Sequence, residues 1–210
     1  MSMSNQHITL LILYYSRHGS TRALADAIAE GATAAGAEVL LRTVADSTRD
    51  QEADTAKQPK SDRDIQVSLE DLKNCDALAL GSPTRFGHMA SSLHAFFETT
   101  STQWLQGSLT DKPAAVFTSS SSLHGGQEST LLSMALPLLH HGMILVGIPY
   151  AEPAVHQTRT GGGPYGASHL SQHQETSLSE HEQQCAEALG RRLVTTASRL
   201  KKEQNLGKHH

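Results

Sequence analysis

The sequence predicts an α/β fold built on a doubly wound, five-stranded parallel sheet with helices on both faces. Short runs of almost uninterrupted apolar residues recur along the chain, as is typical of strands buried on both faces. Amphipathic stretches long enough to form helices separate these runs. Several runs end in loops rich in Gly and Ser, where the carboxyl ends of parallel strands are expected to meet.

Five apolar runs are the predicted strands. The first has no polar residue apart from Thr9, so it lacks the alternation expected of a strand with one solvated face. The predicted strands cover residues 8–15, 38–44, 77–81, 114–117 and 143–148.

The helices are predicted between and after the strands, at residues 21–35, 91–99, 127–141 and 179–202. In the last of them, apolar residues recur at spacings of three and four and form one buried stripe. The stripe consists of Ala186, Leu189, Leu193, Ala197 and Leu200. Ser179 and Glu182 are spaced as a capping box at its start.

Two polar segments are additional to the strands and helices of a minimal doubly wound domain. Residues 46–68 are charged and poor in apolar side chains, which predicts an insertion or a mobile loop. Residues 150–177 are rich in Gly, Ser, Gln and His, which predicts a long loop used for function or subunit contact, or a disordered one. Residues 1–210 show no repeat or second boundary and are expected to form one domain with these insertions.

The composition excludes several classes. Seventeen Lys and Arg against 21 Asp and Glu give a net charge of −4, which indicates neither a basic nucleic-acid face nor a dense acidic docking surface. The run at 8–15 lacks a basic flank and is shorter than the roughly 20 residues of a membrane span. Cys75 and Cys185 form no disulfide framework. We expect a soluble cytoplasmic protein that binds neither nucleic acid nor membrane.

The first strand runs into a hydroxyl-rich loop directly before a helix. A helix N-terminus presents unpaired N–H groups and a partial positive charge, and therefore suits phosphate. The loop has no Walker lysine and no GxGxxG pattern, so it fits a phosphate monoester held without Mg²⁺. An ordinary helix N-cap is the alternative. The loop reads Ser16-Arg17-His18-Gly19-Ser20-Thr21.

Loops at the ends of the third and fourth strands are predicted to converge on the same pocket. From residue type alone, Arg85 either balances negative charge or forms a surface ion pair. Phe86 either packs on a flat ligand or fills the core. Trp104, the only tryptophan, suits a flat substrate or an interface. The two loops read Ser82-Pro83-Thr84-Arg85-Phe86-Gly87 and Ser119-Ser120-Ser121-Ser122-Leu123-His124-Gly125.

Four motifs in fixed order carry a family resemblance. They are the loop at 82–87, His124-Gly125-Gly126-Gln127-Glu128, His140-His141-Gly142-Met143 and Gly163-Pro164-Tyr165-Gly166-Ala167. Over residues 7–200 the chain resembles the flavodoxin-like, WrbA-type NAD(P)H:quinone oxidoreductases. The resemblance implies an FMN enzyme that takes hydride from NADH or NADPH and reduces quinones to hydroquinones by two electrons. It also implies a homotetramer.

The resemblance further implies site roles. Ser16 to Thr21 hold the FMN phosphate, Pro83 to Phe86 lie beside the isoalloxazine ring, and Ser119 to Gly125 flank its other side. His140 completes the pocket from a neighbouring subunit. His18 contacts the nicotinamide nucleotide and Trp104 lines the substrate face. The run Ser119–Ser122 replaces the Thr/Gly pattern of many relatives, and His18 stands where many have Tyr.

The remaining alternatives concern metals and other flavoproteins. The chain has 13 histidines but no zinc-type spacing, so no metal site is expected. A flavodoxin-type electron shuttle would dock through a dense acidic surface, which a net charge of −4 fits poorly. A flavin-binding regulatory protein, with residues 150–177 as its contact surface, is the third possibility.

Overall fold

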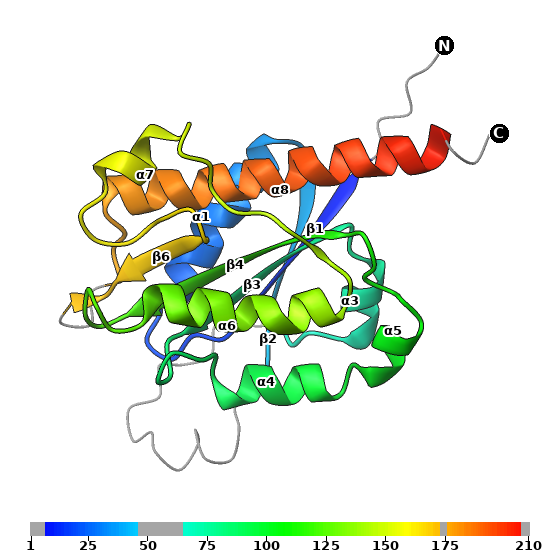
Figure 1. Cartoon of the computed structure of the whole chain (residues 1–210), viewed down its shortest axis with the longest axis horizontal. Helices are drawn as coiled ribbons and strands as arrows, with labels where there is room; N and C mark the ends of the chain where they lie inside the picture. The colour runs from blue at the N-terminus through cyan, green and yellow to red at the C-terminus, as the bar shows by residue number, and fades with distance from the viewer. Residues whose placement is uncertain (1–6, 46–64, 173–175, 207–210) are drawn as a thin grey trace.

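The computed structural model describes residues 7–45, 65–172 and 176–206 (Figure 1). Strands and helices alternate through most of the chain. In order they are β1 (Ile8–Tyr14), α1 (Ser20–Ala34), β2 (Ala37–Thr43), α3 (Leu69–Asn74), β3 (Ala77–Pro83), α4 (Ser91–Glu98), α5 (Ser101–Leu105), β4 (Pro113–Ser120), α6 (Gln127–His140), β5 (Ile144–Leu145), α7 (Pro153–Gln157), β6 (Ala167–Leu170) and α8 (Glu180–Leu206).

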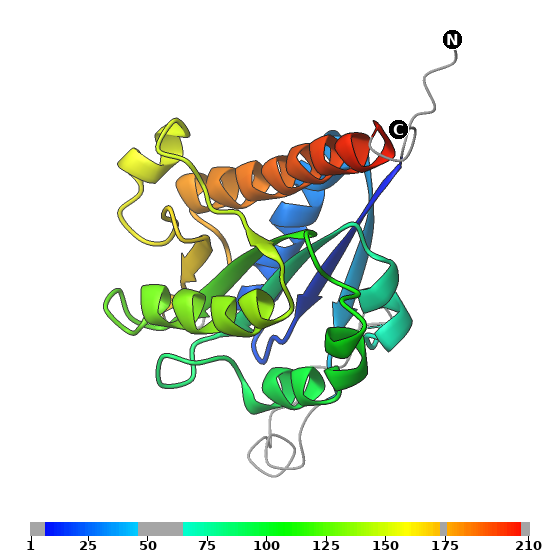
Figure 2. The ribbon, with the colours of Figure 1, turned by 45° about the vertical axis from the view of Figure 1, so that its right-hand side comes forward.

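The strands form one parallel sheet in the order β2-β1-β3-β4-β5, and β6 also pairs with β4. Helices α1 and α8 cover one face, and α3, α4 and α6 cover the other (Figures 1 and 2). The predicted doubly wound parallel sheet with helices on both faces is confirmed, with β6 as an additional strand.

Alternation along β1 divides the core into two layers. Leu10 and Ile12 pack in the cluster under α1 and α8, whereas Leu11 and Leu13 pack under α3, α4 and α6. All four side chains are fully buried. Successive residues of a strand point to opposite faces, so a strand covered on both faces needs apolar side chains at every position.

Glycines allow α1 and α8 to lie backbone against backbone. A Cβ on Gly31 would overlap the carbonyl oxygen of Glu187, and one on Gly190 would overlap that of Ile28. Glycine inside a helix is unfavourable by about 0.5–1 kcal/mol relative to Ala, so close helix packing offsets that cost here. This contact holds the first half of α8 against the second half of α1.

The fifth predicted strand, residues 143–148, is wrong in length, because β5 covers only Ile144–Leu145. β5 pairs with the first residues of β4, whereas β6 pairs with Phe117–Ser120 farther along the same strand. The chain after β5 turns away, and the N–H of Ile148 donates to the carbonyl of Pro164 at 3.2 Å. Strand β6 therefore takes the place that a longer β5 would occupy.

The two polar segments have different outcomes. Residues 150–177 were expected to lack regular structure; this is wrong, because they contain α7 and β6. Of residues 46–68, positions 46–64 lie outside the described part of the chain. Gln66 forms a parallel bridge with Thr43 at the end of β2. Ser68 and Asp71 form a capping box at the start of α3, a short helix that was not predicted from the sequence.

Two further properties of the described residues concern the length of the helices and the chemistry of the cysteines. None of their helices is both long enough and apolar enough to cross a membrane. Cys75 and Cys185 are free and buried, and burial raises the pKa of each thiol to about 11. Thiols with such pKa values are poor nucleophiles, which indicates a structural role for both cysteines.

Candidate active site

A pocket of about 410 Å³ opens at the carboxyl ends of β1, β3 and β4, beside the end of β6. Its lining carries two arginines and a histidine but no carboxylate, so its charge favours an anionic ligand. The lining residues are Ser16, Arg17, His18, Ser20, Thr21, Pro83, Thr84, Arg85, Ser119, Ser120, Ser121 and Ser171. All of these except Ser171 are site residues predicted from the sequence.

The loop between β1 and α1 leaves helix amides available. Gly19 has a φ of 94°, in the left-handed region where Gly is favoured, and α1 begins at the next residue. The Ser16 hydroxyl oxygen accepts from the N–H groups of Gly19 at 3.2 Å and Arg22 at 3.3 Å. The N–H groups of Ser20 and Thr21 take part in none of the hydrogen bonds found among the described residues. Unpaired N–H groups at a helix N-terminus are favourable for an anion.

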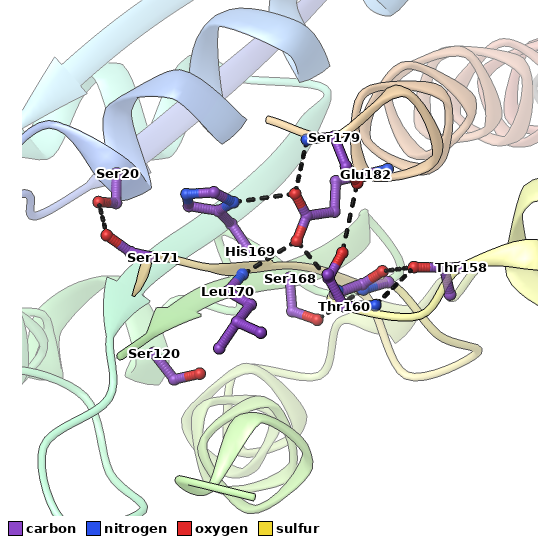
Figure 3. A network of polar contacts seen from close by, with 12 residues as sticks. Ser20, Ser120, Thr158, Thr160, Ser168, His169, Leu170, Ser171, Ser179 and Glu182 are labelled. Atoms are coloured by element: carbon purple, nitrogen blue, oxygen red, sulfur yellow. Dashed lines mark hydrogen bonds and ion pairs between the residues drawn. The ribbon is translucent and has the colours of Figure 1, made fainter. Parts of the chain in front are cut away.

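Side-chain hydroxyls join the first loop to neighbouring strands. Thr21 is 1% exposed, and its hydroxyl lies 2.8 Å from that of Ser119 at the end of β4. Ser20 donates to the hydroxyl of Ser171 at 2.9 Å (Figure 3). Each hydroxyl is thus held by another strand, which fixes the first turn of α1 in the pocket wall.

The loop after β3 contains a strained turn. Arg85 and His88 exchange backbone hydrogen bonds of 2.8 and 3.0 Å around Phe86 and Gly87. The φ angles of these two central residues are 51° and 80°, which defines a type I′ turn. A bulky aromatic at positive φ is a genuine outlier, and such strain clusters at functional sites.

This turn directs the Phe86 side chain into solvent, with an exposed fraction of 103%. The core-filling alternative for Phe86 is therefore wrong. Arg85 donates to the carbonyl of Thr84 at 3.0 Å and joins none of the ion pairs among the described residues. Arg85 and Phe86 both line a second groove, of about 630 Å³, along α4 together with Met89 and His94, and Phe86 does not line the first pocket.

Helix α6 anchors the strained turn. The Thr84 hydroxyl oxygen accepts from the Thr130 hydroxyl at 2.8 Å and from the Gly87 N–H at 3.3 Å. Ser133 donates to the Gly87 carbonyl at 3.0 Å, and the Thr84 N–H donates to the Ser119 carbonyl at 2.9 Å. These bonds hold Arg85 at the pocket while leaving its side chain in the lining.

The loop after β4 lies only partly in the pocket. Ser119 to Ser121 line it, whereas Ser122 to Gly125 lie outside the lining and Leu123 is 43% exposed. The Ser120 hydroxyl donates to the carbonyl of Ser122 at 2.9 Å and accepts from the Gln127 amide at 3.1 Å. Three of the seven residues of the predicted loop thus line the pocket, and the other four lie outside its lining.

Besides Gly19, Phe86 and Ser122–Gly125, two more distant predicted residues lie outside the lining of this pocket. His140 is exposed at the carboxyl end of α6, and Trp104 is 50% exposed on α5. Neither lines the pocket of its own chain. Ser171, which follows β6, was not among the predicted site residues. Its signal was the short alternation of apolar and polar residues in Ala167–Leu170.

The residues that the structure describes include no cluster of side chains that could hold a metal ion. They contain no group of three or more His, Cys, Asp or Glu side chains arranged to hold an ion. The pocket instead offers amides, hydroxyls and guanidinium groups, which are ligands for an anion rather than a cation.

The chain is similar in sequence to known FMN reductases and quinone dehydrogenases. Residues 8–157 match the sequence model of the NADPH-dependent FMN reductase family. The NAD(P)H dehydrogenase (quinone) of Geotalea uraniireducens strain Rf4 is 41% identical over 201 residues, covering 91% of this chain and 98% of that protein. NAD(P)H dehydrogenase (quinone) 3 of Rhizobium meliloti strain 1021 is 38% identical over 96% of this chain and 95% of that one.

Solved structures show the same fold at lower identity. The WrbA-like flavodoxin protein of Agrobacterium tumefaciens superposes with a TM-score of 0.63 and 21% identity, covering 91% of this chain and 98% of that one. A flavodoxin from the domain Archaea gives a TM-score of 0.59 and 19% identity, covering 92% and 99%. The fold is therefore flavodoxin-like, and the match over residues 8–157 with the two relatives shows that the chain belongs to the NADPH-dependent FMN reductase family.

Proposed function

We propose that this protein reduces quinones to hydroquinones in two-electron steps, with FMN as cofactor and NADH or NADPH as electron donor. The observation that carries the proposal is the carboxylate-free pocket with free helix amides at its base. The relatives named NAD(P)H dehydrogenase (quinone), at 38–41% identity over most of this chain, support the reaction.

The residues at the base of the pocket fit the phosphate of FMN. The N–H groups of Ser20 and Thr21 and the partial positive charge of α1 favour a dianion without a metal. Arg17 lies in the same lining. Gly19 supplies the positive φ with which the loop turns into α1. When bound, FMN supplies hydride acceptance and two-electron transfer.

The upper loops orient the flat part of the ligand and the substrates. Pro83, Thr84 and Arg85 line one side of the pocket, and Ser119 to Ser121 line the other. Phe86, in the adjoining groove, and the segment Ser122–Gly125 contact the flat ligand beyond this lining. The Arg85 guanidinium stabilises the negative charge that reduction creates. The exposed His18 at the pocket contacts the nicotinamide nucleotide.

We also propose that the active form is a homotetramer. Helix α6 carries Leu132, Leu136 and Leu139 on its outer side, each more than half exposed. Ile144 and Leu145 of β5 are also exposed, at 39% and 42%. Contiguous exposed apolar side chains of this kind mark protein interfaces. His140 lies at the end of the same helix and is the residue that we propose completes the pocket of a neighbouring subunit, whereas Trp104 lines the substrate face.

A cytoplasmic location is part of the proposal. Its support is the chemistry of the two cysteines, which are buried, free and far apart in sequence. Proteins from oxidising compartments commonly use cysteine in disulfides.

The test is a coupled measurement on purified protein loaded with FMN. NADH or NADPH and benzoquinone are added under anaerobic conditions, and nicotinamide oxidation and hydroquinone formation are followed together. We expect nicotinamide oxidation and hydroquinone formation to occur together with at least one of the two nucleotides. Neither should occur when FMN is removed. Nicotinamide that stays reduced in the presence of FMN and quinone would refute the proposal.

A further inference from the structure

A buried carboxylate behind the pocket accepts an unusual number of hydrogen bonds. Glu182, on the first turn of α8, is 2% exposed. One oxygen, Oε1, accepts from two backbone N–H groups, and the other accepts from a third N–H group and an imidazole (Figure 3). The donors are the N–H groups of Gly161 (2.9 Å), Leu170 (2.9 Å) and Ser179 (2.8 Å) and Nδ1 of His169 (2.9 Å).

The carboxylate is ionised. Burial by itself raises the pKa of Glu182, but the hydrogen bonds from His169, Leu170 and Ser179 overcome it and lower the pKa to about 2. An ionised carboxylate only accepts, so His169 carries a proton on Nδ1. The His169 side chain is also only 2% exposed, which makes this a buried, fixed pair.

Capping α8 accounts for only part of this arrangement. A capping box requires the Ser179 and Glu182 contacts alone. The Oε1 bonds reach two other segments, the glycine-rich loop at Gly161 and the end of β6 at Leu170. Position 161 must be glycine for this approach, since a Cβ there would overlap the Ser168 carbonyl and lie 2.7 Å from Oε1.

The end of β6 connects Glu182 to the pocket. Leu170 is bound by Glu182, and the next residue, Ser171, accepts from the Ser20 hydroxyl and donates its N–H to the Ser120 carbonyl at 2.8 Å. Alternation along the strand turns His169 toward Glu182 and Ser168 toward α6. The Ser168 hydroxyl donates to the side-chain oxygen of Gln127 at 2.6 Å, and the Gln127 amide donates to the Ser120 hydroxyl at 3.1 Å.

We propose that Glu182 and His169 are positioning residues for the phosphate end of the pocket. They hold β6 so that Ser171 meets Ser20 at the first turn of α1 and Ser120 at the end of β4. Neither side chain lines the pocket, so both act through β6. This inference rests on the proposed function, because it assigns the α1 N-terminus to the FMN phosphate.

The test compares FMN with riboflavin, which lacks the phosphate. Glu182→Gln places an N–H₂ group where one carboxylate oxygen accepts two hydrogen bonds. We expect the Kd for FMN to rise about tenfold or more, equivalent to about 1.4 kcal/mol, while the Kd for riboflavin changes less than about threefold. Flavin fluorescence quenching measures both, and thermal unfolding without flavin is followed in parallel. Glu180→Gln is the matched control, because Glu180 is exposed on the same turn and contacts Gln184.

Two His169 variants keep the test decisive if Glu182→Gln does not fold. His169→Asn retains a donor near the Nδ1 position and is expected to bind FMN within about threefold of the unaltered protein. His169→Leu keeps the bulk but loses the donor and is expected to show the selective loss.

Three results separate the explanations. Selective loss of FMN affinity in Glu182→Gln or His169→Leu, with rescue in His169→Asn, supports positioning. Equal loss of FMN and riboflavin, or no loss in either, overturns it and leaves a structural role. If the unaltered protein binds FMN no more tightly than riboflavin, the assignment of the phosphate site fails instead, and the inference fails with it.

Discussion

Phe86 is expected to lower the stability of the protein while serving its activity. At φ 51° its backbone is in the left-handed region, which is unfavourable for an aromatic residue by about 1–2 kcal/mol. Its side chain is fully exposed, so the ring returns no burial energy in the isolated chain. Asn is favoured at this position of a type I′ turn. Phe86→Asn should therefore raise the free energy of unfolding by about 1 kcal/mol and the Tm by about 3 °C.

The same substitution should impair catalysis. Loss of an aromatic contact with a flat ligand is worth about 0.5–1.5 kcal/mol, so we expect the KM for quinone to rise about fivefold. Phe86→Ala is the matched control, because it removes the ring but keeps an unfavourable residue at positive φ. Its KM should rise equally without the gain in Tm. Thermal unfolding without flavin and steady-state kinetics provide the measurements. A fall in Tm for Phe86→Asn, or unchanged kinetics in both variants, would refute this reasoning.

The other predictions concern packing, charge and pH. Gly190→Ala forces α1 and α8 apart and should lower the unfolding free energy by about 1–3 kcal/mol in urea titrations. Gly163→Ala, with open space around its Cβ, should have little effect. Arg85→Ala should lower kcat/KM for quinone about 10²-fold in steady-state assays, and unaltered turnover would exclude its role in stabilising charge. Ionised Glu182 stabilises the fold above pH 4.5, and this contribution is lost as the pH falls toward 2. Acid unfolding curves should therefore lose part of their slope in that window in Glu182→Gln, and identical slopes would contradict the assignment.

Local sequence pattern was sufficient for the central architecture. The run at 8–15 is apolar at every position that the two helix layers cover, and the period of α8 matches the face it buries. Because these elements are long, the spacing of their own apolar residues is enough to identify them without knowledge of tertiary contacts. The Ser179–Glu182 capping box was also predicted, because it depends on residues within a single turn.

The errors arose where distant contacts decide the structure. β5 is short because β6, about 20 residues later, pairs with the same strand. β6 itself is four residues long and lies in a polar segment, so pattern alone did not separate it from a loop. Glu182 was predicted as a cap, yet its bonds to Gly161 and Leu170 follow from the path of the 158–171 segment.

The same distinction applies to the site. Loops directly after buried strands could be placed from the sequence, since strand ends in a parallel sheet converge. The orientation of Phe86 could not, because an aromatic residue is not expected at the first central position of a type I′ turn. The tetramer and the contributions of His140 and Trp104 remain predictions.

The most direct test of the central claim is the stoichiometry of the quinone reaction under anaerobic conditions. The FMN-loaded protein is given NADH or NADPH with benzoquinone, and the products are quantified while electron paramagnetic resonance monitors the one-electron quinone radical. Two-electron reduction at this pocket predicts one hydroquinone for each nicotinamide oxidised and no radical signal. Nicotinamide oxidation that yields quinone radical, or no hydroquinone at all, would contradict it.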